Sequence, residues 1–334
     1  MDNRKFGSQG PAVGAVGIGA MSFSDFYGPT TDENSFRILE TAMDLGMSHI
    51  DTSNVYGSGR SEKAIGAFLK DRGTEARDFF HIATKAGICR NPDTNERYFD
   101  NSAGYLARAL DESLDRLGVD CVDLFYVHRR EAGRPIEEIA ENLAALVKAG
   151  KTKTIGFSEI APSSLRRAAA VHPVAAVQSE YSLSTRFPEL GLVQACAELG
   201  TTLVAFSPVG RAFLTDTPHG THSISKLGFL KTNPRFQSPN LEANLTITDD
   251  FRALAAEMGC ATASLAIAWL LAQGDHVLPI PGTRSVGHLR ELAAGADLTL
   301  APSDLERIEQ VLPVGWAHGD RYSDDQWIGP ERYC

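Results

Sequence analysis

Four polar side chains stand at or just after consecutive apolar runs, and together they could reduce a carbonyl group. Asp51 lies in "HIDTS", Lys85 ends "HIATK", His128 ends "DLFYVH", and Tyr56 follows Asp51 by five residues. A free tyrosine has a pKa of about 10, and a nearby ammonium lowers it by stabilising the phenolate. Lys85 would supply the ammonium, Asp51 would hold Lys85 charged, and His128 would hydrogen-bond the carbonyl. Tyr56 would then deliver the proton, and a cofactor the hydride.

Each of these residues also has an ordinary structural interpretation. A single Asp or Lys at a strand end can cap a helix or form a surface ion pair, and a buried His or Tyr is often a packed residue. Lys85 also allows a Schiff base of the aldolase type. That chemistry needs an amine of lowered pKa, whereas a neighbouring Asp51 favours the charged form. Four such residues in consecutive units favour the reductase.

Eight short apolar runs recur along the 334 residues, with helical patterns between them. Continuous apolar character is typical of strands buried on both faces of a parallel sheet. Strands are expected at 16–21, 49–53, 81–85, 123–128, 154–159, 176–181, 202–208 and 277–282. Helices are expected over 31–46, 102–118, 135–150, 187–200 and 288–295. The alternation predicts an α/β fold of the (β/α)8 TIM-barrel class, with the chemistry at the carboxyl ends of the strands.

A doubly wound open sheet is the alternative fold, and it usually shows GxGxxG after its first strand. "GAVGIGAMS" has Ser22 where the third glycine belongs, and "GSGRSE" has Glu62 there. Gly57 and Gly59 are therefore interpreted as turn residues, with Ser61 as the cap of the helix that follows.

The organisation of the chain indicates one barrel domain over residues 1–334, since no linker or shift of composition divides it. The polar stretch 209–245 follows the seventh strand and is expected to be a lid or cofactor loop. Residues 313–334 are expected to form a C-terminal tail that closes over the pocket or packs elsewhere.

Composition and charge limit the possible partners. The net charge is −10 without a block of like charges, which argues against nucleic acid and anionic membrane surfaces. No apolar run approaches the roughly 20 residues of a membrane span, and the N-terminus lacks an apolar signal region. No metal site is expected, because no His or Cys spacing suits one. Reduced thiols and a cytoplasmic location are expected from five scattered cysteines without a CxxC motif: Cys89, Cys121, Cys196, Cys260 and Cys334.

Three motifs resemble those of the aldo-keto reductase family: "DTSNVYG" (51–57), "HIATK" (81–85) and "RLGVDCVDLFYVH" (116–128). The resemblance covers essentially the whole chain. It implies that Tyr56 is the general acid, with Asp51, Lys85 and His128 in the roles given above. The segment 156–182 is most similar to a bacterial, plant and fungal branch of pyridoxal reductases and broad aldehyde reductases.

The resemblance also implies a nicotinamide cofactor, NADPH/NADP+, bound without a Rossmann domain. Ser158 and Gln178 would hold the carboxamide, Phe206 would stack on the nicotinamide ring, 207–211 would follow the pyrophosphate, and 283–285 would meet the 2′-phosphate. An arginine and hydroxyls after the eighth strand agree with the usual phosphate site of barrels. The expected cofactor residues are Met21, Asp51, Ser158, Gln178, Phe206, Ser207, Pro208, Val209, Gly210, Arg211, Gly282, Thr283, Arg284, Ser285 and Glu291, the last at the adenine.

Three positions depart from the family pattern. Phe206 stands where the family usually has Tyr, so the stacking face remains and the hydroxyl is lost. Glu159 replaces an Asn of many members, and a carboxylate cannot donate to an amide oxygen. Leu292 replaces a common Asn beside the adenine-contacting position.

The predicted function is reversible NADPH-dependent reduction of a small-molecule aldehyde or ketone to an alcohol. A cofactor-sensing regulatory subunit with little turnover is the other alternative, since barrels of this family also serve as channel subunits. Arg129 would either favour an anionic or polar substrate or form a salt bridge. The expected substrate pocket consists of Phe26, Tyr27, Tyr126 and Arg129. The patterns carry no prediction of the substrate itself or of an oligomeric state.

Overall fold

Eight parallel strands form one sheet in the computed structural model, which describes residues 1–333. The strands are β3 (Ile18–Gly19), β4 (His49–Asp51), β5 (His81–Ala86), β8 (Val122–Val127), β9 (Thr152–Ser158), β10 (Val174–Glu180), β11 (Thr202–Phe206) and β12 (Val277–Pro279). They lie side by side in chain order. Backbone bonds of 2.9 Å from Gly17 N–H to Pro279 O and from Gly19 N–H to Pro281 O join the first strand to the last. The predicted (β/α)8 barrel is confirmed.

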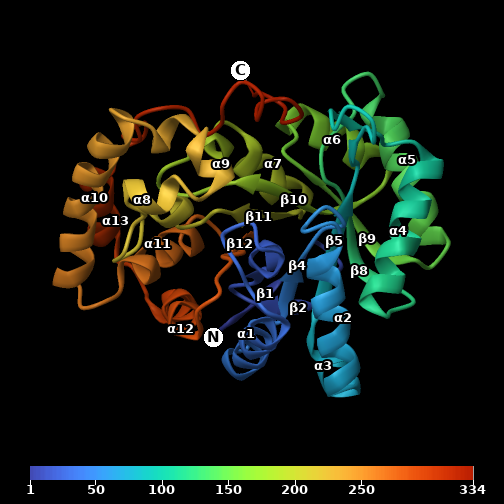
Figure 1. Ribbon diagram of the computed structural model, residues 1–334, viewed down its shortest axis with the longest axis horizontal. Helices are drawn as coiled ribbons and strands as arrows, with labels where there is room; N and C mark the ends of the chain where they lie inside the picture. Colours follow the sequence, from blue (N-terminus) through green and yellow to red (C-terminus); the bar gives the residue numbers. More distant parts are fainter. Residues whose placement is uncertain (334) are drawn as a thin grey trace.

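Helices surround this sheet (Figure 1). They are α1 (Asp32–Leu45), α2 (Arg60–Arg72), α3 (Thr74–Phe79), α4 (Ala103–Leu117), α5 (Ile136–Lys148), α6 (Pro162–Val171), α7 (Leu192–Leu199), α10 (Asn240–Glu257), α11 (Thr262–Leu271), α12 (Val286–Ala294) and α13 (Pro302–Val311). The Thr31 hydroxyl accepts from the N–H of Asn34 at the start of α1, and Gly46, with φ of 76°, ends the helix. Ser102 and Gly118 take the same positions around α4. Hydroxyl side chains at the start and glycines at the end are typical of α-helices.

The start of α2 differs from the prediction. Ser61 lies inside the helix, where its hydroxyl donates to Ala20 O at 2.8 Å, and Gly59 occupies the cap position instead. Gly57 and Gly59 have φ of 60° and 87°, as turn residues do. A Cβ atom at Gly59 would lie 2.6 Å from Cδ of Arg116, so this turn requires glycine.

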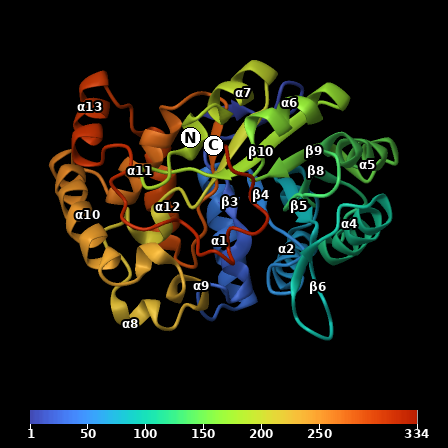
Figure 2. The same ribbon diagram turned by 90° about the horizontal axis from the view of Figure 1, so that it is seen from above.

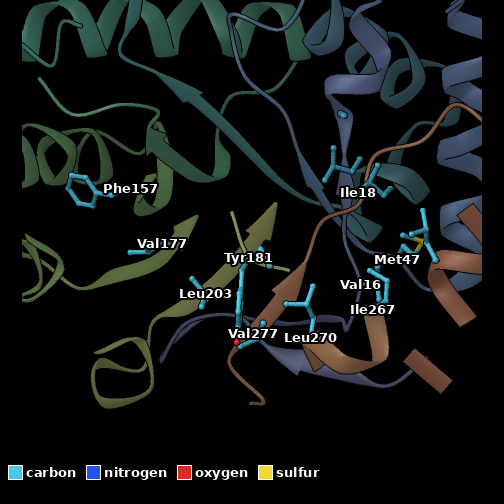
Figure 3. Close-up of a cluster of buried hydrophobic side chains, with 14 of the residues drawn as sticks. Val16, Ile18, Met47, Phe157, Val177, Tyr181, Leu203, Ile267, Leu270 and Val277 are labelled. Atoms are coloured by element: carbon cyan, nitrogen blue, oxygen red, sulfur yellow. The ribbon is translucent and has the colours of Figure 1, made fainter. Parts of the chain in front are cut away.

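Successive residues of a strand point alternately toward the helices and into the barrel, so the core has two layers. Residues that point outward pack against the helices, and Figure 3 shows Val177, Leu203 and Val277 of neighbouring strands with Ile267 and Leu270 of α11. Residues that point inward fill the barrel: Phe6, Val13, Ala83, Leu124, Tyr126, Ala176, Val204, Leu278 and Ile280. The same alternation determines which side chains reach the interior at the strand ends.

The N-terminal end of the barrel is closed by a hairpin of β1 (Asn3–Lys5) and β2 (Ala12–Gly14). Phe6 follows β1, and its ring centroid lies 4.9 Å from that of His49 and 4.5 Å from that of His81. Below this cover, Nδ1 of His49 and Nδ1 of His81 are 2.8 Å apart. Two buried imidazoles therefore share one hydrogen bond at this end of the barrel.

The segment 209–245 contains more secondary structure than the predicted loop. It holds the short helices η3 (Gly210–Ala212), α8 (Thr221–Ile224), α9 (Gly228–Lys231) and η4 (Pro234–Phe236), and α10 begins within it. A second hairpin, β6 (Ile88–Arg90) and β7 (Arg97–Phe99), follows β5.

The chain after α13 crosses above the middle of the barrel, as the red trace in Figure 2 shows. Arg97 Nη2 donates to Asp325 O at 2.6 Å and to Ile328 O at 3.0 Å. The Glu331 carboxylate accepts from Arg130 and, at 2.7 Å, from the N–H of Ala161. These contacts hold residues 313–333, the C-terminal tail, over the C-terminal ends of the strands.

Two further expectations concern thiols and membranes. Four cysteines are free thiols, namely Cys89, Cys121, Cys196 and Cys260, while Cys334 lies outside the described residues. Within residues 1–333 no single helix is long and apolar enough to cross a membrane, and α10 with α11 reaches that length only as a pair bent by 88°.

Candidate active site

A cavity of about 570 Å³ lies at the C-terminal ends of the strands. Most of the predicted catalytic, cofactor and substrate residues line it: Met21, Phe26, Tyr27, Asp51, Tyr56, His128, Arg129, Ser158, Gln178, Phe206, Ser207, Pro208, Val209, Arg211, Gly282, Thr283, Arg284, Ser285 and Glu291. Lys85, Tyr126 and Gly210 are not part of the wall. The barrel therefore brings both halves of the predicted site, from opposite ends of the chain, to one cavity.

A buried ion pair joins Asp51 on the cavity wall to Lys85 behind it. The Lys85 ammonium is fully buried and donates to the Asp51 carboxylate and, at 2.7 Å, to Thr52 O. Nε2 of Gln178 donates to the other Asp51 oxygen at 2.7 Å. Burial raises the pKa of Asp51 and lowers the pKa of Lys85, while the charge of each partner acts in the opposite direction. The strand ends thus place Asp51 and Lys85 together, as the sequence suggested.

Tyr56 lies between Lys85 and the cavity. Its Oη is 3.4 Å from Nζ of Lys85, a long contact, and Nζ lies 5.0 Å from the ring centroid. Burial raises the pKa of Tyr56, and the Asp51 charge raises it further, while Arg129 opposes them. The sequence predicted a lowered pKa, and the structure gives the opposite direction because Tyr56 is buried and the Asp51 carboxylate is close to it. Tyr56 therefore carries its proton at neutral pH.

His128 is the second polar group beside Tyr56, and the two rings meet edge to face with centroids 5.8 Å apart. Burial, then the charges of Arg129 and Lys85, lower the pKa of His128 well below its usual value, so the imidazole is neutral. Its Nδ1 is 3.0 Å from Oγ of Ser53. When Ser53 donates to Nδ1, the imidazole carries its proton on Nε2 and can donate to a carbonyl oxygen.

Ser53 is a site residue that the sequence reasoning missed. It is fully buried, and besides Nδ1 of His128 its Oγ contacts Lys85 O at 3.2 Å. The hydroxyl has one proton and two possible acceptors, so its orientation selects the His128 tautomer. Its place in "DTSNVYG", two residues after Asp51 on the same face of the chain, was the available signal.

Hydroxyl, amide and aromatic groups meet next to these residues. Ser158 and Phe206 end β9 and β11 on the cavity wall, and Gln178 lies two residues before the end of β10. Because Gln178 gives its amide nitrogen to Asp51, its carbonyl oxygen remains free to accept. This end of the cavity can thus hold a planar amide.

The loop after β12 supplies a basic group to another part of the wall. Arg284 Nη1 donates to Pro29 O at 2.8 Å, and within residues 1–333 no carboxylate lies within 4.0 Å of its guanidinium. The hydroxyl of Ser285 caps α12 by accepting from the N–H of His288 at 3.3 Å. An arginine without an acidic partner beside a helix start suits a phosphate group.

Backbone strain gathers in the loop after β11. Ser207, Arg211 and Ala212 all line the cavity and have φ of 51°, 55° and 80°. Non-glycine residues adopt this region rarely, and such strain concentrates where a loop must present groups to a ligand. Gly210, predicted to contact the cofactor, turns the same loop with φ of 58° instead.

Tyr126 was predicted to line the cavity, and the structure shows that it does not. It precedes His128 by two residues in β8, so both point inward, and Tyr126 lies one layer deeper in the barrel. A Cβ atom at Gly156 would lie 2.6 Å from the Tyr126 ring, which shows how closely that layer is packed. The prediction rested on its place near the end of a strand, which does not give its depth in the barrel.

Glu159 explains one departure from the family pattern. Its carboxylate accepts from Oγ of Ser179 at 3.1 Å and from the N–H of Glu180 at 2.8 Å, and it forms a buried ion pair with Arg321 of the C-terminal tail. The Arg321 charge lowers the pKa of Glu159 although burial opposes this. Glu159 therefore anchors the tail and does not line the cavity.

Aromatic residues outside the barrel strands complete the wall, and the sequence reasoning missed two of them, Phe229 and Tyr322. Arg211 pairs with Glu180 at 2.8 Å, and its guanidinium lies 4.6 Å from the ring centroid of Phe229 and 5.8 Å from that of Tyr322. The Phe229 ring centroid is 5.7 Å from that of Phe26. Aromatic residues within otherwise polar stretches were the only signal for them. The wall residues outside the prediction include Thr215, Asp216, Thr217, His219, Phe229, His288 and Tyr322.

Comparison with known proteins identifies the family. Residues 15–313 match the Aldo/keto reductase family. The chain belongs to this family. It is 39 % identical over 322 residues to Aldo-keto reductase yakc of Schizosaccharomyces pombe, a name that specifies NADP(+), covering 96 % of this chain and 94 % of the relative. It is 37 % identical over 321 residues to Probable aldo-keto reductase 1 of Glycine max, covering 95 % and 91 %.

Solved structures of aldo-keto reductases share the fold. A glycerol dehydrogenase of Gluconobacter oxydans superposes with a TM-score of 0.81 at 25 % identity, over 93 % of this chain and 95 % of that one. A thermostable aldo-keto reductase solved with the inhibitor epalrestat gives 0.74 at 27 % identity, over 93 % and 100 %. The barrel seen here is thus the fold of an oxidoreductase family.

Proposed function

We propose that this aldo-keto reductase reduces an aldehyde or ketone to an alcohol with NADPH, in a reversible reaction. The observation that carries the proposal is the placement of Tyr56 and His128 side by side on the cavity wall, with the Lys85–Asp51 pair directly behind Tyr56. NADPH, when bound, supplies the hydride, with both electrons, to the carbonyl carbon. The carbonyl oxygen must receive a proton in the same reaction.

Tyr56 is the proposed proton donor. Its pKa is raised by burial, so the phenol is fully protonated at neutral pH, and it donates from Oη to the carbonyl oxygen. The phenolate that results lies beside the Lys85 ammonium, which stabilises the negative charge until solvent returns the proton. His128, neutral and oriented by Ser53, holds the carbonyl oxygen through Nε2.

The residues present fit a nicotinamide dinucleotide phosphate. Ser158 and the free carbonyl of Gln178 suit the carboxamide, and Phe206 offers a ring for stacking. Arg284, which has no acidic partner among residues 1–333, suits the 2′-phosphate. The name of the fission-yeast relative, which specifies NADP(+), supports the same cofactor.

The geometry argues against the aldolase alternative. Lys85 is absent from the cavity wall, is fully buried, and its ammonium already contacts Asp51, Thr52 and Tyr56. A substrate carbonyl has no path to its nitrogen. The four groups in place together also favour turnover over a sensing subunit.

Tyr56→Phe tests the proposed reaction. Loss of the phenol proton should lower kcat for NADPH oxidation with 4-nitrobenzaldehyde by at least about 100-fold, the usual contribution of a general acid. NADPH binding, followed by protein fluorescence, should not change. Tyr98→Phe is the control, because Tyr98 is exposed on the β6–β7 hairpin away from the cavity. Undiminished turnover in Tyr56→Phe would show that another group delivers the proton.

Arg284→Ala tests the cofactor assignment. Removal of a charge-assisted contact to the 2′-phosphate should weaken NADPH binding by about 10- to 100-fold and leave NADH binding nearly unchanged. Dissociation constants for both cofactors provide the measurement. Arg290→Ala, at an exposed position of α12, is the control. An equal loss for NADPH and NADH would contradict the assignment.

A further inference from the structure

Arg129 has unused hydrogen-bond donors on the cavity wall. It follows His128, and its contacts run through one nitrogen: Nη1 donates to His128 O at 2.7 Å and to Ser158 Oγ at 3.1 Å. Within residues 1–333, Nε and Nη2 make no hydrogen bond, and neither atom is sealed from solvent. A guanidinium has five N–H donors in a planar fork, so most of this one is available to a ligand.

The acidic residues around Arg129 are committed elsewhere. The Glu159 carboxylate is paired with Arg321, and the Glu331 carboxylate is paired with Arg130. In the described part of the chain no carboxylate lies within 4.0 Å of the Arg129 guanidinium. The salt bridge considered from the sequence is therefore not formed, and the charge stands half-buried without a partner.

An unpaired charge that is partly removed from water is unfavourable unless a partner compensates it. Proteins normally supply that partner from their own side chains. Here the Arg129 charge helps to lower the pKa of His128 and opposes the rise in the pKa of Tyr56, so its field reaches the groups that handle the carbonyl. Because Nε and Nη2 are open to solvent, water compensates the charge until a bound anion takes its place.

The position of Arg129 separates it from the proposed phosphate site. Arg284 lies beside Pro29, after β12. Arg129 lies after β8, beside His128 and under the C-terminal tail, where a Cβ atom at Gly329 would come within 3.3 Å of Arg129 Cδ. The anion that meets Arg129 is therefore part of the substrate rather than of the cofactor.

We infer that Arg129 binds a carboxylate carried by the substrate, so that the protein prefers carbonyl compounds that are also carboxylic acids. The inference rests on the proposed function and names its substrate class. The planar fork of Arg matches the two oxygens of a carboxylate. One unpaired guanidinium balances one negative charge, whereas a phosphate monoester carries nearly two at neutral pH.

The test compares two aldehydes of nearly equal shape, 4-carboxybenzaldehyde and the uncharged 4-nitrobenzaldehyde. Their kcat/KM values are measured with NADPH for the wild type and for Arg129→Gln, which keeps an N–H donor but loses the charge. The ratio of carboxylate to nitro compound should fall by about 10- to 100-fold in the variant, as expected for a charge-assisted hydrogen bond. The dissociation constant of NADPH should stay the same.

Two further variants separate recognition from a general effect of charge. Arg166→Gln removes an exposed charge on α6 and should leave the ratio unchanged. Arg129→Lys keeps the charge without the fork and should lose part of the preference.

Several outcomes would overturn the inference. Equal losses for both aldehydes, or weaker NADPH binding alone, would show that Arg129 only supports His128 and Ser158. An Arg129-dependent preference for glyceraldehyde 3-phosphate over the carboxylate would assign the site to phosphate.

Turnover of neither aldehyde by the wild type would count against the proposed function but not against the binding of a carboxylate by Arg129. Benzoate binding by calorimetry would then decide the inference, which fails if Arg129→Gln binds as tightly as the wild type.

Discussion

Strands β4 and β5 carry buried polar side chains at both ends, and the two ends differ in what those side chains face. At the C-terminal end, Asp51 lines the cavity and forms an ion pair with Lys85 behind it. At the N-terminal end, His49 and His81 share one hydrogen bond under the ring of Phe6. The same two strands therefore serve chemistry at one end and structure at the other, as in barrels generally.

The comparison teaches that a buried, perturbed polar group does not by itself mark a catalytic site. Burial lowers the pKa of His81 to about 4 and that of His49 well below its usual value, so both imidazoles are neutral. A perturbed pKa alone would identify His49 and His81 as candidate catalytic residues as strongly as it identifies His128. Access to the cavity distinguishes them, because only His128 lines it.

The largest expected effect concerns stability at the N-terminal end. The folded-state pKa of His81 is about 4, below the ordinary value of about 6.5 for an unfolded chain. The unfolded state therefore binds protons first, and stability that is present above pH 6.5 is lost as the pH falls toward 4. The loss should be on the order of 3 kcal/mol for this group. His81→Gln should make the free energy of unfolding depend less on pH.

Urea unfolding at pH 7 and at pH 4.5 provides the measurement. His222→Gln, at an exposed position of α8, should retain the full pH dependence. Turnover per folded molecule of His81→Gln at pH 7 should equal that of the wild type. A pH dependence identical to that of the wild type would mean that the pair does not titrate differently in the folded and unfolded states.

A smaller effect is expected from Ser53→Ala at the C-terminal end. The variant loses the hydroxyl that orients His128, and one such hydrogen bond is worth about 1 kcal/mol, so kcat should fall roughly 5- to 10-fold. The pH profile of kcat should also change, while the pH dependence of unfolding should not. Ser61→Ala is the matched control, because Ser61 is equally buried but bonds to Ala20 O and Thr52. Equal changes of kcat in both variants would remove Ser53 from the site.

Much of the fold was predictable because barrel strands are uniformly apolar. All eight apolar runs contain strands of one sheet. Because the carboxyl ends of parallel strands lie at one edge of a sheet, the sequence also predicted that Asp51 lies beside Lys85. The direction of the Tyr56 pKa shift was not predictable, because it depends on burial and on how closely the Asp51 carboxylate approaches the phenol. The depth of Tyr126 in the barrel was not predictable either, because it depends on how the strands are arranged in three dimensions.

The C-terminal tail was the least predictable part of the site. Arg321 reaches Glu159 across 162 positions of sequence, and Tyr322 enters the cavity from a segment without helix or strand. The hydrophobic periodicity of a sequence does not predict such contacts, because they form where an irregular segment happens to lie beside groups of opposite charge.

The closure of the barrel between its first and last strands has a consequence for biosynthesis. Gly17 and Gly19 bond to Pro279 and Pro281, so β3 has only one neighbour until β12 has been made. Ribosomes add roughly 5–20 residues per second, and β3 therefore waits on the order of tens of seconds for its second neighbour. An unpaired edge is a template for aggregation during that time. A nascent chain that stops before β12 would lack both the closed barrel and the part of the cavity wall that follows this strand.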